Sequence, residues 1–543
     1  MRWWPLSGAG LERFGEEGRW AVTPEPRPAP GAIVAAVEAV TVCASDAKMV
    51  RLGADYPLFG GRDLARDPVC LGHELALRIV EVGSGVADPV LTPGLRIGVQ
   101  PDVYNHGRRS CIGVNLQGGM ADRIVLGPGI LASDDGALVF PVDSGLSRAS
   151  VALLEPLGCV EGAFRLWGRD AAKPGGRMIV LCADPAANWV LDRPLPAGRI
   201  DLVGLGARDW MGAGGPEPAV LRSSTLETLL SDDTPVDDLL VLGAGDPAAI
   251  GQVYDRLASG GTFTWLSDAE VQPTVPVDLA HFHYGKLTQR GARSRRLSDA
   301  WARPIRTDYK PGGALLVFGA SGAMGRIHLM RALQAPAKPA TLVAVARRPD
   351  KLAAAIDELA PLAARHGRNL TGVALDDDAD WRARLMAVAP GGFDDVIVVA
   401  PGEEAMRLAV PFVASGGLLV GFAGTKAGEI VELPLGRLLG DGVNLTASSG
   451  STVADQQRVV AHTLAGTLSP DLLIAAVGGF PATRDAVAAV LAGRFSGKVL
   501  ILPALDWPLM TLGALFAAHP ELEPLAGPGL SWSKAIEDAV LGS

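Results

Sequence analysis

LLVFGASGAMGRIHLMRA, residues 315–332, reads as a buried strand, a glycine-rich turn and the start of a helix. Glycines at such a turn let backbone N–H groups approach a pyrophosphate, and the helix N-terminus adds partial positive charge. The spacing is GxxGxxG rather than GxGxxG, so the motif indicates a dinucleotide site only together with its neighbours. The residues expected to meet the cofactor here are Gly319, Ser321, Gly322, Ala323, Met324 and Gly325.

The next predicted strand, Thr341–Ala346, ends without the acidic residue that would hold the adenine ribose of NAD. Arg347 and Arg348 follow it directly. Because guanidinium groups bind phosphate oxygens bidentately, this pair favours the 2′-phosphate of NADP over NAD. The alternative is that both arginines are solvated residues at the end of a strand.

The middle of the chain, from about residue 173 to 446, contains two versions of one pattern. PGGRMIVLCAD (174–184) resembles PGGALLVFGAS (311–321), and DDLLVLG (237–243) corresponds to DDVIVVA (394–400). Matched segments of this kind indicate a tandem duplication of a βαβ dinucleotide-binding unit.

The first version of the pattern differs from the second where a phosphate would bind. Its turn has no glycine, Asp184 would repel a pyrophosphate, and Pro185 lacks a backbone donor. We therefore expect a degenerate unit that no longer binds cofactor. Packing or dimer formation is its expected role, and binding of a regulatory ligand is the alternative.

The first 165 residues contain short strands separated by Gly and Pro and followed by a helix, which is typical of a β-rich domain. Taken singly, Cys43, His73 and Glu155 have ordinary structural explanations, such as packing or a helix-dipole contact. Together they provide a soft, a borderline and a hard ligand, which suits catalytic Zn²⁺ with an open fourth position. Cys159, one helical turn beyond Glu155, either packs or competes as a ligand.

Three motifs resemble those of the zinc-dependent medium-chain dehydrogenases/reductases, in the sorbitol dehydrogenase-like branch. They are C-x-S-D (43–46), G-H-E (72–74) and E-P-L (155–157). The glycine-rich turn also loosely resembles that of the L-sorbose-1-phosphate reductase type. The resemblance implies an α/β fold: a β-rich GroES-like catalytic domain plus two tandem doubly wound Rossmann-like units, the first degenerate. The expected boundaries are 1–165, completed by 479–543, for the catalytic domain, 166–310 for the degenerate domain, and 311–478 for the NAD(P)-binding domain.

The resemblance also assigns roles to individual residues. The implied zinc ligands are Cys43, His73 and Glu155, with Glu74 as an alternative ligand. Ser45 would hydrogen-bond the substrate oxygen and begin proton relay, and Asp46 would orient His73. Backbone around Ala400 would contact the nicotinamide.

The chain departs from the family pattern in one place. Many relatives carry four closely spaced cysteines that bind a second, structural zinc, whereas residues 100–119 contain only Cys111. One thiol cannot complete a tetrahedral site, so we expect one catalytic zinc and no structural zinc. Four polar residues of this segment indicate a surface loop or, as the alternative, recognition of a hydroxylated or phosphorylated substrate: Tyr104, His106, Arg108 and Arg109.

Composition limits the remaining possibilities. A net charge of −10 argues against a nucleic-acid partner or an anionic membrane surface. No apolar run approaches a membrane span, and the start, MRWWPLSGAG, lacks the apolar core of a signal peptide. Five cysteines, an odd number in 543 residues, do not form a disulfide framework, so we expect a reducing cytoplasm. The family resemblance implies a homo-oligomer, either a dimer or a tetramer.

The leading hypothesis is an enzyme, a zinc-dependent NAD(P) oxidoreductase that prefers NADP(H). Its substrate would be a polyol or ketose, or a sugar-phosphate-like alcohol or ketone. One alternative is a catalytically silent sensor or scaffold that binds a nicotinamide nucleotide. Another is a zinc-free quinone or enone reductase of the same superfamily, which the ligand set of the first 165 residues argues against.

Overall fold

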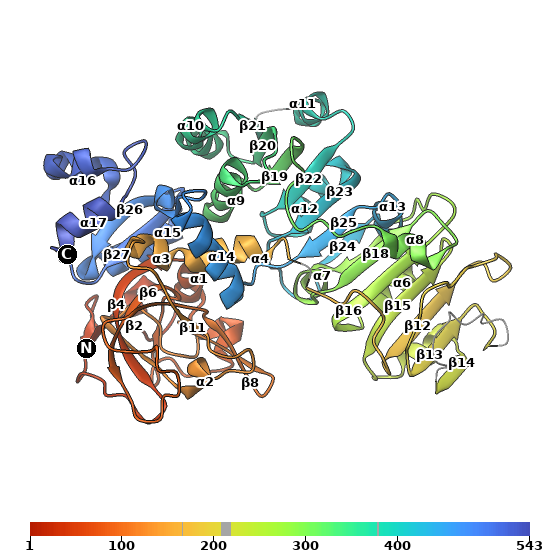
Figure 1. The fold of residues 1–543 in the computed structure, drawn as a ribbon, viewed down its shortest axis with the longest axis horizontal. Helices are drawn as coiled ribbons and strands as arrows, with labels where there is room; N and C mark the ends of the chain where they lie inside the picture. Colours follow the sequence, from red (N-terminus) through yellow and green to blue (C-terminus); the bar gives the residue numbers. More distant parts are fainter. Residues whose placement is uncertain (166, 208–218, 377–378, 543) are drawn as a thin grey trace. The chain divides into compact units, whose positions relative to one another are not determined.

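The computed structural model describes residues 1–543 except 166, 208–218, 377–378 and 543 (Figure 1). The chain forms two compact units. Unit one comprises residues 1–161, 322–327 and 451–543, and unit two comprises residues 162–321 and 328–450. Within the described ranges, no helix combines the length and the apolar character needed to cross a membrane.

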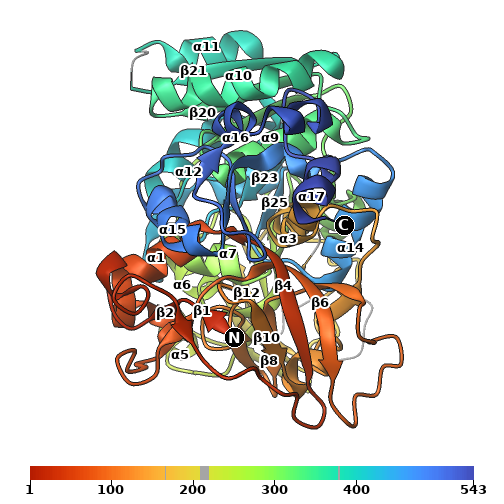
Figure 2. The ribbon, with the colours of Figure 1, turned by 90° about the vertical axis from the view of Figure 1, so that its left-hand side faces the viewer.

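An eight-stranded sheet forms the centre of unit one (Figure 2). Its strands are β4 (Ile33–Val42), β6 (Glu74–Val82), β7 (Arg96–Val99), β10 (Arg123–Leu126), β11 (Val139–Pro141), β26 (Ile474–Gly479), β27 (Lys498–Leu502) and β28 (Met510–Thr511). They follow the order β11-β7-β6-β4-β27-β26-β28, and β10 pairs with β4. The apolar strand β4 pairs antiparallel with both β6 and β27, so strands from the two ends of the sequence share one sheet.

Shorter elements surround this sheet. The small strands are β1 (Arg2–Trp3), β2 (Pro5–Leu6), β3 (Ala21–Val22), β5 (Val69–Cys70), β8 (Asp102–Asn105) and β9 (Arg108–Cys111). The helices are α1 (Ala44–Leu52), α2 (Pro128–Leu131), α3 (Arg148–Ala152), α4 (Leu154–Gly162), α14 (Val453–Leu464), α15 (Thr483–Leu491), α16 (Leu512–Ala518) and α17 (Lys534–Leu541). The segment that the sequence indicates as a surface loop contains an antiparallel hairpin, β8–β9, in which Arg109 forms an ion pair with Asp102 at 2.7 Å.

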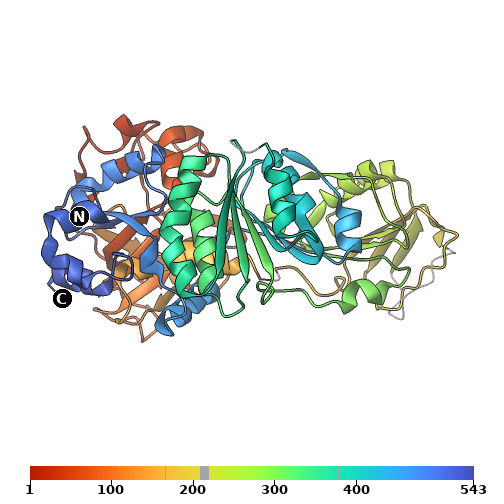
Figure 3. The same ribbon diagram turned by 90° about the horizontal axis from the view of Figure 1, so that it is seen from above.

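Unit two contains two six-stranded parallel sheets that adjoin one another (Figure 3). The first sheet, which we call the first copy, has the order β14-β13-β12-β15-β16-β18, and the second copy has the order β21-β20-β19-β22-β23-β25. The strands of the first copy are β12 (Arg177–Cys182), β13 (Arg199–Val203), β14 (Val220–Ser223), β15 (Val236–Leu242), β16 (Leu257–Leu266) and β18 (Thr288–Ala292). Those of the second copy are β19 (Ala314–Phe318), β20 (Thr341–Ala346), β21 (Asn369–Ala374), β22 (Phe393–Val398), β23 (Val413–Gly421) and β25 (Asn444–Ala447). The same strand order in both copies confirms the predicted pair of Rossmann-like sheets.

The helices of the two copies differ after the first strand. In the second copy, α9 (Ala323–Gln334) connects β19 to β20, and α10 (Pro349–Arg365), α11 (Trp381–Val388), α12 (Glu403–Ala409) and α13 (Leu435–Gly440) follow. The first copy has α5 (Leu226–Leu230), α6 (Pro247–Tyr254), α7 (Leu279–Tyr284) and α8 (Leu297–Ala302). Residues 183–198, which connect β12 to β13, contain no helix. Three prolines in this short stretch oppose helix formation: Pro185, Pro194 and Pro196.

The C-terminal segment is held to the rest of unit one by a buried carboxylate. Glu537 of α17 accepts hydrogen bonds from the backbone N–H groups of Arg148 and Ala149, at 2.6 and 2.8 Å. It therefore satisfies free donors at the N-terminus of α3. Trp532 Nε1 also donates to it, at 2.9 Å. Burial raises the pKa of Glu537 despite these donors.

A second carboxylate near α3, that of Asp471, makes the stability of unit one dependent on pH. Burial first, and then the negative charge of Glu537, raise the pKa of Asp471 to about 7 from an ordinary value of 3.8. The folded protein thus holds a proton that the unfolded chain releases, and stability falls as pH rises from about 4 to 7. We expect Asp471→Asn to remove about 2–3 kcal/mol of this dependence between pH 4 and 7. Urea denaturation across that pH range measures it.

The control for this prediction is Asp485→Asn, which replaces an exposed carboxyl group in α15 of the same unit. That variant should keep the pH dependence of the unsubstituted protein. If Asp471→Asn and Asp485→Asn gave the same pH profile, the raised pKa of Asp471 would be wrong.

Candidate active site

The turn between β4 and α1 places Cys43 beside a fully buried carboxylate. Asp46 accepts a hydrogen bond from the backbone N–H of Cys43 at 2.9 Å, which fixes the first turn of α1. Its other oxygen accepts from the backbone N–H of Gly72 at 3.2 Å. Asp46 therefore holds the Cys43 turn against the segment that carries His73.

His73 directly precedes β6, and its two ring nitrogens face different side chains, those of Asp46 and Ser45. Its Nδ1 lies 3.5 Å from Asp46 Oδ1, and its Nε2 lies 3.4 Å from Ser45 Oγ. Burial alone would lower the pKa of His73, but the Asp46 carboxylate and the Cys43 thiol raise it well above 6.5. Asp46 thus lies on the Nδ1 side of the ring, and Nε2 lies on the side of Ser45.

Three potential ligand atoms lie close together at this point. They belong to Cys43, His73 and Glu74, and all lie within 4.8 Å of one another. A thiol, an imidazole and a carboxylate in one partly buried cluster are ligand types that fit a Zn²⁺ ion.

Glu74 is already engaged by other side chains of unit one. It is fully buried, Thr41 Oγ1 donates to one of its oxygens, and Lys498 forms an ion pair with the other. Burial alone would lower the pKa of Lys498, but the negative charge of Glu74 raises it. Lys498 begins β27 and was missed in the sequence. The only signal was a lysine that opens an apolar strand, KVLIL.

Glu155 lies at the start of α4, outside the set of mutually close ligand atoms. Cys159 Sγ donates to Glu155 Oε1 at 3.3 Å, so the two residues that share a helical face contact each other. Burial raises the pKa of Glu155 to about 6; the charge of His73 opposes this and that of Glu74 adds to it. These electrostatic effects arise because Glu155 is near the cluster.

The glycine-rich turn of the second copy has the predicted strand, turn and helix. β19 ends at Phe318, Gly319 has φ +96°, and α9 begins at Ala323. A Cβ atom on Gly319 would lie 2.4 Å from the backbone nitrogen of Ala400, whereas one on Gly322 would meet nothing within 4 Å. Gly319 is thus required by the fold, and Gly322 leaves space at the backbone for a ligand.

Arg347 and Arg348 follow β20 and are both exposed. Arg348 forms an ion pair with Asp350 at 2.5 Å, which partly neutralises it. In the part of the chain that the structure describes, no ion pair to Arg347 is found. Arg347 is therefore the better placed of the two for a phosphate group.

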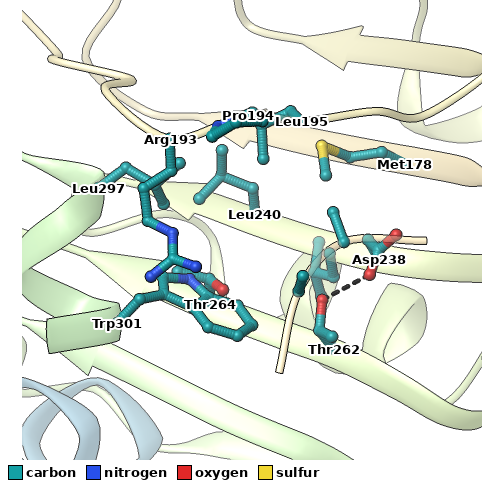
Figure 4. Close-up of a pocket in the computed structure, with 13 residues that line it drawn as sticks. Met178, Arg193, Pro194, Leu195, Asp238, Leu240, Thr262, Thr264, Leu297 and Trp301 are labelled. Atoms are coloured by element: carbon teal, nitrogen blue, oxygen red, sulfur yellow. Dashed lines mark hydrogen bonds between the residues drawn. The ribbon is translucent and has the colours of Figure 1, made fainter. Parts of the chain in front are cut away.

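The first copy has filled the places that correspond to this site. Trp189 Nε1 donates to the carbonyl of Asp184 at 2.8 Å across the turn after β12, and Trp265 Nε1 donates to that of Gly243 at 2.9 Å. A separate cavity of about 20 Å³, lined by Asp238 and Thr262 and by no residue of the turn after β12, lies between the sheet and the segment 193–195 (Figure 4). It has room for about one water molecule and not for a nucleotide.

The first part of the chain matches a known protein family. Residues 29–132 match the alcohol dehydrogenase GroES-like domain family. The chain therefore contains an alcohol dehydrogenase GroES-like domain. The predicted resemblance to the medium-chain dehydrogenases is confirmed by this match together with the fold.

Similar proteins include mannitol-1-phosphate 5-dehydrogenase of Aliivibrio fischeri, 26% identical over 43% of this chain and 57% of that protein. L-sorbose 1-phosphate reductase of Klebsiella pneumoniae is 27% identical over 51% of this chain and 64% of that protein. The chain thus spans between half and two thirds of the curated relatives it matches. The crystal structure of 2R,3R-butanediol dehydrogenase from Bacillus subtilis shares the fold, with a TM-score of 0.53 and 15% identity, spanning 92% of this chain and 99% of that one.

The close approach of Ala400 gives a test of the glycine-rich turn. Gly319→Ala should lower the free energy of unfolding by about 2 kcal/mol or more, because it combines a positive φ with a backbone clash. Gly322→Ala is the matched control and should leave that free energy nearly unchanged. Chemical denaturation of both variants measures the difference. Equal stability of the two variants would contradict the contact between Gly319 and Ala400.

Proposed function

We propose that the protein is a zinc-dependent oxidoreductase that transfers a hydride between NADP(H) and an alcohol or ketone of the polyol, ketose or sugar-phosphate class. The observation that carries the proposal is the cluster of Cys43, His73 and Glu74, with Asp46 holding the imidazole. A cytoplasmic location fits the five free cysteines.

The zinc ligands would be Cys43, His73 and Glu155, with Glu74 as the alternative third ligand. Both oxygens of Glu74 are taken by Thr41 and Lys498, so its negative charge is largely compensated inside the protein. Within the residues that the structure describes, the hydrogen bond to Glu155 comes from the weak thiol donor of Cys159, and burial disfavours the charged form of Glu155 unless a cation is near. When bound, Zn²⁺ supplies a Lewis acid that polarises the substrate oxygen.

The protein's own side chains would handle the proton. Ser45 is half-buried, and its hydroxyl lies 3.4 Å from His73 Nε2, on the open side of the cluster. It is the group we assign to the substrate oxygen and to the first step of proton transfer. Asp46 keeps Nδ1 of His73 turned away from that side, so Nε2 remains the ligand atom.

NADP(H) would lie on the second copy, where it serves as hydride donor or acceptor. The turn that begins at Gly319 offers backbone N–H groups and the N-terminus of α9 to the pyrophosphate. Arg347 would bind the 2′-phosphate, since Arg348 is already paired with Asp350. Ala400 lies where β22 ends, and its backbone would contact the nicotinamide.

The substrate class rests on the named relatives. Mannitol-1-phosphate 5-dehydrogenase and L-sorbose 1-phosphate reductase are named for sugar-phosphate substrates. A catalytically silent nucleotide sensor is the second candidate, and the first copy favours it because its turn after β12 lacks the glycines of a phosphate-binding turn. Metal analysis of protein purified with zinc separates the two.

The zinc assignment predicts separate effects for the two glutamates. Cys43→Ala and Glu155→Gln should each lower zinc affinity by about a hundredfold or more and abolish ketose reduction. Cys70→Ala, which replaces a buried thiol outside the cluster, is the control and should retain zinc. Atomic absorption after dialysis measures the metal content. If Glu74→Gln lost zinc while Glu155→Gln kept it, Glu74 would be the third ligand.

The cofactor assignment predicts that replacing Arg347 reduces the preference of the protein for NADPH over NADH. Arg347→Ala should raise the Kd of NADPH by about tenfold and leave that of NADH unchanged, because only NADPH carries the 2′-phosphate. Arg348→Ala is the matched control, with a smaller effect because of its ion pair with Asp350. Fluorescence titration gives both constants. An Arg347→Ala protein with the original NADPH/NADH preference would refute the phosphate role.

A further inference from the structure

The two copies of unit two meet through equivalent elements. β17 (Val275–Asp278) follows β16 in the first copy, and β24 (Ile430–Leu433) follows β23 in the second. These two strands pair with each other, antiparallel, and form a sheet of their own. The contact between copies is therefore made by the same part of each.

The register of the strands reveals a local two-fold axis. Thr288 lies opposite Thr262 in the first copy just as Asn444 lies opposite Leu418 in the second. The same number of residues separates Thr262 from Leu418 and Thr288 from Asn444, and this offset makes Glu432 the equivalent of Pro276. In the antiparallel pair, Pro276 lies opposite Glu432, its own equivalent. Such self-pairing is what an isologous interface between two subunits produces, and here it lies within one chain.

Other contacts across this interface are reciprocal. Helix α7 of the first copy contacts β25 of the second, α13 of the second contacts β18 of the first, and β18 and β25 adjoin each other (Figure 1). Phe282 and Val277 belong to the same buried apolar cluster as Leu438 and Val431. The last strand of each sheet therefore lies against the other copy, and the two sheets remain separate.

The interface becomes asymmetric at the ends of β22 and β23. A narrow hollow of about 10 Å³ there is lined by Ala400 and Gly421 of the second copy and by Phe282 and His283 of the first. A Cβ atom on Gly421 would lie 2.7 Å from Phe282 Cε1, so Gly421 is fitted to the first copy.

His283 makes two polar contacts to the second copy from a buried position. Its Nδ1 lies 3.0 Å from the carbonyl oxygen of Gly421, and its Nε2 lies 3.0 Å from Ser449 Oγ. Because a carbonyl only accepts, Nδ1 carries the proton and the Ser449 hydroxyl donates to Nε2. Burial lowers the pKa of His283, which keeps the ring neutral in this arrangement.

The equivalent positions on the other side of the axis carry none of these features. Leu439 is the equivalent of His283, and Trp265 is the equivalent of Gly421. Trp265 is buried, and its indole N–H donates a hydrogen bond to the carbonyl oxygen of Gly243, which is the equivalent of Ala400. The polar contact is thus present only on the side of the copy that has kept its glycine-rich turn.

We propose that the first copy is a built-in partner subunit for the second, and that His283 is a positioning residue for the cofactor site. His283 and Phe282 hold the strand end at Gly421, and Gly421 lines the same hollow as Ala400, whose backbone would contact the nicotinamide. With a volume of about 10 Å³, the hollow is too narrow to admit a nicotinamide ring. This inference rests on the proposed binding of NADP(H) to the second copy.

The test compares two histidines of α7 in the full-length protein. His283→Ala should raise the Kd of NADPH about five- to tenfold, because the strand end loses its hydrogen-bonded support. The Kd of 2′-phospho-ADP-ribose, which lacks the nicotinamide, should stay unchanged. His281→Ala is the matched control, since His281 packs on Tyr254 of the first copy, and both constants should stay unchanged. Fluorescence quenching and calorimetry measure them.

Each outcome of this comparison has a distinct meaning. If the unsubstituted protein binds neither NADPH nor the fragment, the proposed function fails. If it binds both, and His283→Ala equals His281→Ala, the role of the first copy is overturned. If His283→Ala weakens both ligands equally, the effect is structural and the positioning role is overturned.

A second pair of variants tests the same contact if His283→Ala does not fold. Gly421→Ala should weaken NADPH binding because its new methyl group meets Phe282. Phe282→Ala added to it should restore at least part of the affinity by making room from the opposite copy. A double variant as weak as Gly421→Ala alone would overturn the proposal.

Discussion

The buried ion pair of Glu74 and Lys498 joins the start of the fold to its end. Glu74 opens β6 and Lys498 opens β27, and β4 lies between these strands in the sheet. Both side chains are almost wholly buried, so removing either one would leave an uncompensated charge that costs about 3–5 kcal/mol. The pair also lies beside the proposed metal ligands, because Glu74 directly follows His73. The geometry of the metal site therefore depends on correct closure of the sheet by residues 498–502.

The two copies of unit two satisfy a different constraint. A parallel sheet has to be covered on both faces, and the last strand of each copy lies at an edge of its sheet. Here β18 and β25 adjoin each other, and the antiparallel pair of β17 and β24 adds backbone hydrogen bonds across the interface. A tandem arrangement makes this association intramolecular, so it does not depend on protein concentration.

Local motifs were sufficient to predict the strand, turn and helix at Gly319 and the duplicated sheets, because these features depend on residues near each other in the sequence or on a repeated pattern. The close placement of Cys43, His73 and Asp46 was implied by the family resemblance, since these residues come from separate segments. Lys498 was not predicted, because its partner Glu74 is 424 residues away and a single lysine gives no signal of such a contact. The missing helix of the first copy was also not predicted, although its prolines were visible, because the repeat suggested a complete βαβ unit.

The asymmetry between the copies follows from what each must do. To act as a partner, the first copy has to supply the edge strand β18, the strand β17 that pairs with β24, and one face of α7. None of these three elements belongs to the turn after β12. Replacements in that turn, such as Asp184 and Pro185, therefore leave the interface intact. Trp265 adds buried apolar area to the first copy at the position where the second copy keeps Gly421. The same position cannot be enlarged in the second copy, because Phe282 already occupies that space. Trp265 and Gly421 are thus both fitted to the same interface, Trp265 against Gly436 and Gly421 against Phe282.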